Sequence, residues 1–277
     1  MWCEQINHHL TFYPDKMEGC CSGFQGPILL KNLTENIEID WEKIKQERLD
    51  FIKRLENNDI PKGCNGCPHL KDGSIPEDED FRYKKIILNH YTHCNCKCVY
   101  CTRMKYYPRD FTETQRKPDY YHVLPIIKQI YALGDSEVNK RFMKVDFQGG
   151  DLCVLDEFED VLQFLLDNGC NDLEFTTNNL IYQPMIEKCL AASRGFMISS
   201  LDCGSRETYL KLKKVDKFDV FVENIKRYLA AINDKYRILL SYIVVKNIND
   251  NLEEAQKFLN LIKELGIERI RFEIDYN

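Results

Sequence analysis

Residues 84–101 read KKIILNHYTHCNCKCVYC, and this stretch decides how the rest of the chain is interpreted. Its first half is a short apolar run typical of a buried strand. Its second half holds four cysteines within eight positions, of which Cys94, Cys98 and Cys101 have the spacing C-x3-C-x2-C. In parallel α/β folds, functional sites lie at the carboxyl ends of the strands. The stretch therefore predicts a thiolate site directly after a strand.

The chain beyond residue 84 alternates between apolar runs and amphipathic stretches. We predict strands over residues 84–91, 142–148, 172–177, 195–202, 236–245 and 267–276. We predict helices over residues 118–134, 155–169, 183–193, 217–232 and 251–266. Such alternation implies parallel βαβ units, so the fold class is α/β. Six repeats fit a doubly wound sheet or an incomplete barrel, and periodicity alone does not choose between them.

The first 75 residues or so follow a different pattern. They predict a small hairpin formed by residues 8–14 and the segment after residue 19, then a helix over residues 39–57 with Asp40 as its N-cap. A turn rich in proline and glycine follows, and residues 71–80 form a polar linker. We expect two domains with a boundary near Pro76. They are a small α+β metal-binding module over residues 1–76 and a core over residues 77–277.

Composition narrows the function classes. The 277 residues carry a formal net charge of −6, which argues against a surface that tracks nucleic-acid phosphates. No apolar run approaches the roughly 20 residues of a membrane span, and no basic-then-apolar signal segment begins the chain. We therefore expect a cytoplasmic protein that has neither a nucleic-acid nor a membrane partner.

The 13 cysteines need an explanation in a reducing compartment, where clustered thiols point to metal or catalysis rather than disulfides. Cys153, Cys170, Cys189 and Cys203 stand singly in apolar contexts and are interpreted as small buried side chains. Cys96 breaks the spacing of the cysteine loop and is interpreted as a spacer.

Three thiolates at C-x3-C-x2-C spacing can bind three irons of one cubane cluster and leave the fourth iron without a protein ligand. Catalytic metal sites keep one position open in this way. A structural zinc site or an electron-transfer ferredoxin would use four protein ligands instead. The spacing therefore favours a catalytic cluster over zinc, a ferredoxin or disulfides.

From Lys84 to its end, the chain resembles the radical S-adenosylmethionine (SAM) enzymes, whose C-x3-C-x-aromatic-C loop follows the first strand of a partial (β/α)6 TIM-type barrel. Tyr100 stands at the aromatic position. The resemblance implies a 4Fe-4S cluster on Cys94, Cys98 and Cys101. It also implies SAM contacts from Tyr100, Gly149, Gly150, Asp151, Thr177, Asn178, Ser200, Asp202, Arg206, Ile243 and Val244. Asp151 stands where the family commonly has glutamate.

The same resemblance implies a reaction. A reduced cluster cleaves SAM to methionine and a 5′-deoxyadenosyl radical, which abstracts hydrogen from a substrate. Such an enzyme needs a reducing partner such as flavodoxin or ferredoxin, and its substrate would be a peptide, a protein or a small polyol. The alternatives are an iron–sulfur electron-transfer or redox-sensing protein without turnover, and a zinc-stabilised binding module.

Four further thiols come from separate N-terminal segments and predict a closed metal site: Cys3, Cys20 or Cys21, Cys64 and Cys67. Their order resembles half of the SPASM/Twitch modules, which hold auxiliary iron–sulfur clusters in radical SAM enzymes. Such modules usually follow the barrel, whereas this one precedes it. Lys16 replaces a glycine of the motif, and counting from it favours Cys21. We expect a second 4Fe-4S cluster, with zinc as the alternative and His8, His9 and His69 as candidate zinc ligands.

The chain ends at Asn277, directly after the last predicted strand and without a closing helix. We therefore expect a truncated chain or a missing C-terminal region. Asp275 and Tyr276 end that strand, and we predict that they act as catalytic groups in substrate binding or proton transfer.

Overall fold

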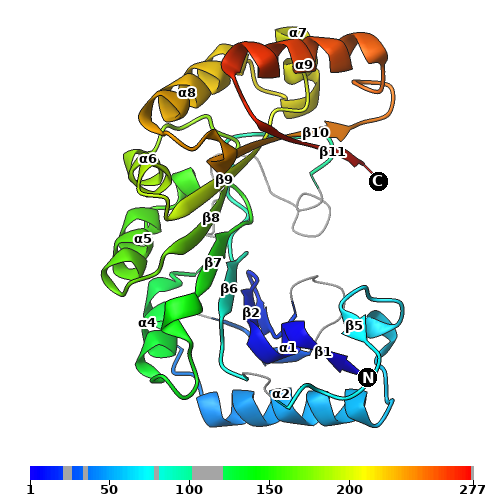
Figure 1. Ribbon diagram of the computed structural model, residues 1–277, viewed down its shortest axis with the longest axis vertical. Coiled ribbons are helices and arrows are strands. Elements are labelled where there is room, and N and C mark those ends of the chain that lie inside the picture. Colours follow the sequence, from blue (N-terminus) through cyan, green and yellow to red (C-terminus); the bar gives the residue numbers. More distant parts are fainter. Residues whose placement is uncertain (21–26, 34–36, 78–80, 102–120, 276–277) are drawn as a thin grey trace. The chain divides into compact units, whose positions relative to one another are not determined.

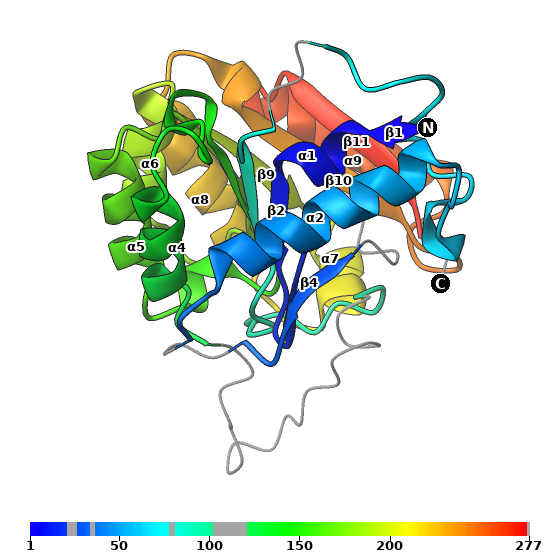
Figure 2. The same ribbon diagram turned by 90° about the horizontal axis from the view of Figure 1, so that it is seen from below.

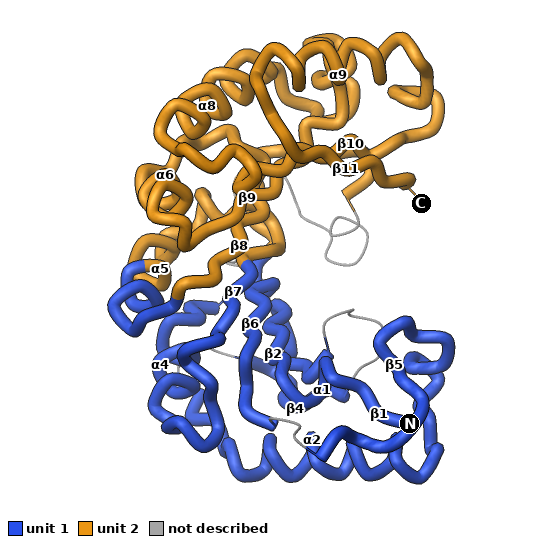
Figure 3. Tube along the Cα trace, in the orientation of Figure 1, with its two compact units in different colours: residues 1–91, 118–146, 163–170 blue, residues 92–117, 147–162, 171–277 orange. Residues whose placement is uncertain are grey.

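The structure is a computed structural model that describes residues 1–20, 27–33, 37–77, 81–101 and 121–275. The chain forms two compact units, coloured separately in Figure 3. The first unit comprises residues 1–91, 118–146 and 163–170, and the second comprises residues 92–117, 147–162 and 171–277. This division differs from the predicted boundary near Pro76, which stays a prediction.

The first unit contains strands in the order β7-β6-β2-β3-β4. Their bounds are β2 (His9–Phe12), β3 (Lys16–Glu18), β4 (Ile28–Lys31), β6 (Lys85–Leu88) and β7 (Lys144–Phe147), the last residue of which belongs to the second unit. A hairpin is present, but its second strand is β3, which pairs antiparallel with β2 and lies within residues 15–19, earlier in the chain than predicted. Strand β2 also pairs in parallel with β6, from His9 opposite Lys85 to Phe12 opposite Leu88. The hairpin is thus part of the sheet that contains the first predicted core strand.

The helices of the first unit are α1 (Glu4–His8), α2 (Trp41–Glu56) and α4 (Leu124–Ala132), with 3-10 turns at Lys62–Cys64 and Lys140–Phe142. Helix α2 begins as predicted, since the Asp40 side chain accepts a hydrogen bond of 3.0 Å from the amide of Lys43. It packs against β4 and against β1 (Trp2–Cys3), which pairs with β5 (Leu70–Lys71). Figure 2 shows α2 lying across β2 and β4.

The second unit contains four parallel strands in the order β11-β10-β9-β8. They are β8 (Asp172–Thr176), β9 (Gly195–Ser200), β10 (Ile238–Val244) and β11 (Arg269–Ile274). The helices are α5 (Phe158–Asp167), which ends in the first unit, α6 (Pro184–Ala191), α7 (Arg206–Lys213), α8 (Phe218–Ala231) and α9 (Leu252–Leu265). Two 3-10 turns cover Leu152–Val154 and Lys235–Arg237. Helices α6, α8 and α9 lie along one face of the strands (Figure 1).

Aromatic side chains pack between the strands and the helices, and these buried residues are the ones whose spacing predicted the elements. The rings of Phe147 and Phe175 stack, and Phe158 meets both edge-on, with centroid distances of 5.4 to 6.4 Å. Tyr242 meets Phe258 of α9 at 5.0 Å. The six predicted strands and five predicted helices are confirmed over shorter spans. Helix α7 was not predicted, because its sequence RETYLKLK is mostly polar. Among the described residues, no helix combines the length and the apolar composition that crossing a bilayer requires.

Candidate cofactor site

The cysteine loop, residues 92–101, belongs to the second unit and is held by main-chain hydrogen bonds on two sides. On one side the amide of Asp151 donates to the carbonyl of His93 at 2.7 Å. On the other side the amides of Lys97 and Val99 donate to the carbonyls of Lys213 and Leu212, at 3.0 and 2.9 Å. These carbonyls belong to the last turn of α7 and have no partner within the helix. The loop thus supplies hydrogen-bond donors for the last carbonyls of α7, and these hydrogen bonds hold the loop in place.

The predicted Gly-Gly segment lies against the loop. A Cβ atom at Gly150 would lie 1.8 Å from the carbonyl oxygen of His93, so only glycine permits this approach. Gly149 has a φ of +115°, a conformation that other residues rarely adopt. Both predicted glycines are therefore required by the local backbone, and the segment that follows β7 touches the cysteine loop.

The thiols of Cys94, Cys98 and Cys101 are all partly exposed, whereas Cys96 is buried. The amide of Cys96 donates to Sγ of Cys94 at 3.4 Å, and the amide of Cys101 donates to the carbonyl of Cys98 at 3.1 Å. The Cys96 thiol lies within hydrogen-bonding reach of both neighbours, and this lowers the pKa of Cys94 and lowers the pKa of Cys98 to about 6. Because the thiolate is the form that binds metal, these thiols suit iron.

Asn178, which follows β8, also reaches the loop. Its Nδ2 donates to Sγ of Cys94 at 3.3 Å and to Oδ1 of Asn95. The main-chain amide of Asn178 donates to the Asp151 carboxylate at 2.6 Å. The structure therefore brings the predicted Asn178 to a predicted cluster ligand.

The carboxylate of Asp151 is completely buried, and its hydrogen-bond partners are other residues of the protein. It accepts hydrogen bonds from Oγ1 of Thr177 at 2.9 Å and from the amide of Cys153 at 3.0 Å, besides the one from Asn178. Burial raises the pKa of Asp151, although these hydrogen bonds oppose the shift. The carboxylate connects the segments that follow β7 and β8, and a direct contact with SAM stays a prediction.

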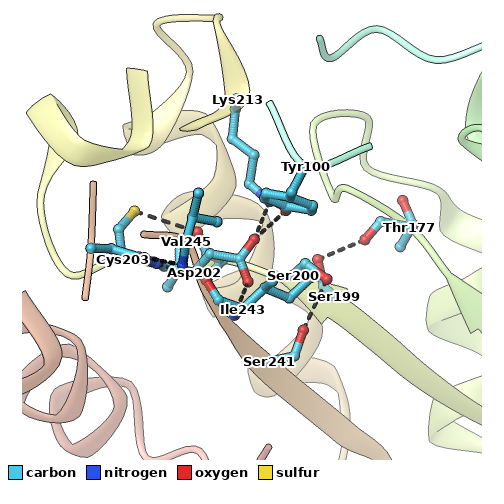
Figure 4. Close-up of polar contacts among 12 residues, drawn as sticks. Tyr100, Thr177, Ser199, Ser200, Asp202, Cys203, Lys213, Ser241, Ile243 and Val245 are labelled. Carbon is cyan, nitrogen blue, oxygen red and sulfur yellow. Dashed lines mark hydrogen bonds and ion pairs between the residues drawn. The ribbon is translucent and has the colours of Figure 1, made fainter. Parts of the chain in front are cut away.

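The segment after β9 meets the loop through three polar side chains (Figure 4). The Tyr100 hydroxyl donates to Oδ2 of Asp202, and Nζ of Lys213 contacts both, 2.5 Å from the carboxylate. Oδ1 of Asp202 accepts from the amide of Ile243 on β10 at 2.8 Å. Asp202 has a φ of +65°, which aspartate tolerates better than most residues. Tyr100, Asp202 and Lys213 thus connect the cysteine loop with the segment after β9, with α7 and with β10.

Lys213 is a site residue that the sequence analysis missed. It is 2% exposed at the end of α7. Burial would lower its pKa, but Asp202 and Cys98 raise it more, so the ammonium stays charged. One sequence signal could have identified it, since Lys213 lies four residues after the buried Tyr209 and so on the same helix face. That signal is readable only once α7 itself is predicted.

The other predicted residues are divided between the site and the surface. The hydroxyls of Ser200 and Ser241 lie 2.9 Å apart on neighbouring strands, and the side chains of Ile243 and Val244 are half-buried on β10. The predicted SAM contact of Arg206 stays a prediction, and its guanidinium is exposed and pairs with Asp216 at 2.7 Å and Asp219 at 2.9 Å. The amide of Asp275 donates to the carbonyl of Val244 at 3.0 Å, and Tyr276 lies outside the described residues.

The N-terminal thiols lie together in the first unit. Burial raises the pKa of Cys3, and the nearby thiols of Cys20 and Cys67 add to the increase. The pKa of Cys64 rises for the same reasons, through burial and then through Cys20, Cys3 and Cys67. Cys20 is thus near enough to Cys3 and Cys64 to influence both, whereas Cys21, which counting favoured, lies outside the described residues.

Within the described part of the chain, no three His, Cys, Asp or Glu side chains lie close enough to hold one metal ion. Ligands of a cubane bind separate irons and are therefore farther apart than ligands of a single ion. The candidate histidines have other surroundings: Nδ1 of His8 lies 3.0 Å from the carbonyl of Arg82, and His69 is exposed. Burial, followed by the charge of Lys85, lowers the pKa of His9 to about 3. An iron–sulfur cluster on the four N-terminal thiols stays a prediction, as does zinc.

No protein-family model matches the chain. A probable GTP 3′,8-cyclase of Saccharolobus islandicus is 28% identical over 194 residues, which are 69% of this chain and 55% of that protein. The GTP 3′,8-cyclase of Lactiplantibacillus plantarum is 27% identical over 172 residues, which are 62% of this chain and 48% of that protein. The chain therefore spans about half the length of these curated relatives.

Two solved structures resemble the chain over most of its length. Streptococcus suis SuiB bound to the precursor peptide SuiA has a TM-score of 0.52 at 14% identity, covering 89% of this chain and 47% of SuiB. Native anSMEcpe with bound AdoMet and the Cp18Cys peptide has a TM-score of 0.51 at 18% identity, covering 70% of this chain and 51% of that protein. This likeness concerns the fold, and it confirms the predicted class, an α/β chain of the partial TIM-type barrel kind.

Proposed function

We propose that this chain is a radical SAM enzyme whose second unit binds a 4Fe-4S cluster through Cys94, Cys98 and Cys101 and binds SAM beside it. When bound, these groups supply one-electron chemistry, in which the reduced cluster cleaves SAM to methionine and a 5′-deoxyadenosyl radical that abstracts hydrogen from a substrate. The activity, substrate and partners of the whole protein are all part of the proposal.

One observation carries the proposal. The segments that follow three successive strands all contact the same cysteine loop, through Asp151 after β7, Asn178 after β8 and Asp202 after β9. Parallel α/β folds build their active sites from such segments. The three thiols in the loop stay partly exposed within this otherwise buried polar setting. An open, oriented set of thiolates is what a catalytic cluster needs.

The residues of the chain would have distinct roles toward these groups. We assign Gly149 and Gly150 to the SAM site, because Gly150 lies directly against the main chain of His93 in the cysteine loop. We assign Tyr100, Thr177, Ser200, Ile243 and Val244 to the surroundings of SAM, and Asn178 to both SAM and Cys94. Asp275 and Tyr276 remain our candidates for substrate binding or proton transfer. A flavodoxin or ferredoxin in the cytoplasm would supply the electron.

We propose that the first unit holds an auxiliary 4Fe-4S cluster on Cys3, Cys20, Cys64 and Cys67. The mutual electrostatic influence of these thiols supports the assignment. A closed set of four ligands leaves no iron open for SAM, so this cluster would serve electron transfer or folding.

For the substrate we propose a peptide or a small molecule. The sequence relatives are named for a cyclase of GTP, and one of the similar structures contains a precursor peptide. A small polyol also remains within the proposal.

The test is anaerobic reconstitution with iron and sulfide, reduction by dithionite and addition of SAM. Methionine and 5′-deoxyadenosine should form in equal amounts, because one bond cleavage yields both. Cys98→Ala should abolish their formation, whereas Cys170→Ala, which changes a buried thiol of the first unit, should not.

The same experiment separates the alternative function. An electron-transfer or redox-sensing protein would bind iron and change its oxidation state but would leave SAM intact. A colourless protein that binds zinc would be a binding module. Equal SAM cleavage by wild type and Cys98→Ala would show that the cysteine loop is not the site.

A further inference from the structure

Lys213 is a buried cation beside the cysteine loop. Helix α7 does not by itself require a buried lysine at its last residue. Lys213 ends α7, and both its main chain and its side chain turn toward the loop. Its carbonyl accepts from the amide of Lys97 at 3.0 Å, and its ammonium contacts the Tyr100 hydroxyl. The side chain is 3% exposed and its ion-pair partner, Asp202, is completely buried.

These contacts hold the loop at two points, one on both sides of Cys98 and one at Tyr100. The first point is the pair of main-chain hydrogen bonds from Lys97 and Val99 to the end of α7. The second is the Tyr100 hydroxyl, which reaches the Lys213–Asp202 pair (Figure 4). Loss of the ammonium would leave the carboxylate of Asp202 buried with a charge that nothing matches. The tie at Tyr100 would then weaken, and the part of the loop that carries Cys98 would loosen.

The charge of Lys213 also acts on whatever Cys98 binds. A reduced cluster carries one more negative charge than an oxidised one, so a nearby buried cation stabilises the reduced form. The carboxylate of Asp202 lies next to the ammonium and has the opposite effect. Burial keeps both effects strong, because little water screens them.

We propose that Lys213 is a positioning residue that fixes the Cys94–Cys101 loop through Tyr100 and Asp202, and that its charge raises the reduction potential of the cluster bound there. The part that concerns the cluster rests on the function proposed above. The part that concerns the loop does not, because it can be measured on protein without iron.

The first measurement is the midpoint potential of the cluster whose EPR signal responds to SAM, determined by titration in the absence of SAM. Lys213→Met should shift this potential to more negative values, and Asp202→Asn should shift it to more positive ones. The double variant should lie between them, since both charges are gone. Lys213→Arg should restore the wild-type value. Lys211→Met should change nothing, because Lys211 is exposed and pairs with Glu207 on the same helix.

The second measurement is hydrogen exchange of the amides in residues 94–101 in iron-free protein. Lys213→Met should accelerate their exchange by about tenfold, which corresponds to the loss of one hydrogen bond. Lys211→Met should leave the rate unchanged. If Lys213→Met does not fold, the double variant replaces it, since it leaves no unmatched charge.

The outcomes separate the two proposals. A wild-type potential together with wild-type exchange in Lys213→Met, or in the double variant when that replaces it, would overturn the role of Lys213. If the wild-type protein forms no SAM-responsive cluster, the proposed function falls, and the exchange rates alone then decide whether Lys213 positions the loop.

Discussion

At the scale of single residues, the approach of Gly150 to His93 sets the tightest constraint on the site. A methyl group at residue 150 would lie 1.8 Å from a carbonyl oxygen that also accepts the amide of Asp151. The two segments would have to separate, and the cysteine loop would move with His93. Replacing Gly150 by alanine therefore tests whether the site depends on the contact between residue 150 and the cysteine loop.

We predict that Gly150→Ala reduces SAM cleavage by at least about tenfold, because a misplaced reacting group costs one to two orders of magnitude in rate. The measurement is 5′-deoxyadenosine formed per bound iron. Gly169→Ala is the matched control, since residue 169 has a φ of +81° and no atom within 4 Å of a new Cβ. The control should lose about 1 kcal/mol of unfolding free energy through backbone strain and keep its activity. Full activity of Gly150→Ala would contradict the prediction.

We predict that the unfolding free energy decreases at acidic pH because of His9. Burial and the charge of Lys85 lower its pKa from 6.5 to about 3 in the folded state. The unfolded state therefore binds the proton first, and stability is complete above pH 6.5 and falls as the pH drops toward 3. At pH 5 the loss amounts to at most about 2 kcal/mol.

Urea unfolding at pH 7 and pH 5 measures this effect. The difference between the two unfolding free energies should shrink in His9→Gln, because glutamine does not titrate. The same substitution at the exposed His69 should leave the difference as in wild type. An unchanged difference in His9→Gln would show that His9 keeps an ordinary pKa.

At the scale of elements, α2 connects the packing of the first unit to its thiols. Ile6, Phe51, Ile52 and Leu55 form a buried cluster, against which Cys3 and Cys64 pack. The helix therefore contributes to stability and also fixes two of the four proposed ligands. A cavity in this cluster should disturb both.

We predict that Leu55→Ala lowers the unfolding free energy by about 2–5 kcal/mol, as expected for removing a buried leucine. It should also speed the reaction of Cys3 and Cys64 with a thiol reagent, mapped by mass spectrometry. Leu259→Ala on α9 is the control, because this leucine is 38% exposed and lies in the other unit. Unchanged thiol reactivity in a destabilised Leu55→Ala would separate packing from ligand placement.

At the scale of the whole molecule, the two proposed metal sites belong to different compact units. Cys94, Cys98 and Cys101 lie in the second unit, and the four N-terminal thiols lie in the first. Each set should therefore bind its metal without the other.

We predict roughly eight irons in fully reconstituted protein, four per cubane. Replacement of all three loop cysteines by alanine should leave about half of this iron, and the remaining signal should not respond to SAM. Cys64→Ala/Cys67→Ala should instead keep the SAM-responsive signal. Zinc in place of the second four irons would contradict the auxiliary cluster and leave the loop assignment untouched.

Local sequence patterns predicted all of the core strands, most of the helices and the ligand spacing of the cysteine loop, because these features are encoded over short distances. Short runs rich in apolar residues predicted the strands from β6 to β11, and the C-x3-C-x2-C spacing predicted the open thiolate set. Asp40 was predicted as a cap for the same reason, since its partner is only three residues away. Helix periodicity, capping and ligand spacing are local properties, so one sequence suffices to predict them.

Only the tertiary structure decided which distant residues meet. It paired β2 with β6, grouped Cys20 with Cys3 and Cys64, and joined Tyr100 to Asp202 and Lys213 across more than 100 residues. It also directed the carboxylate of Asp151 into the protein and Arg206 toward the surface. A polar side chain is buried only where a partner offsets the loss of water. That partner is set by how the strand ends come together, which the local sequence pattern does not encode.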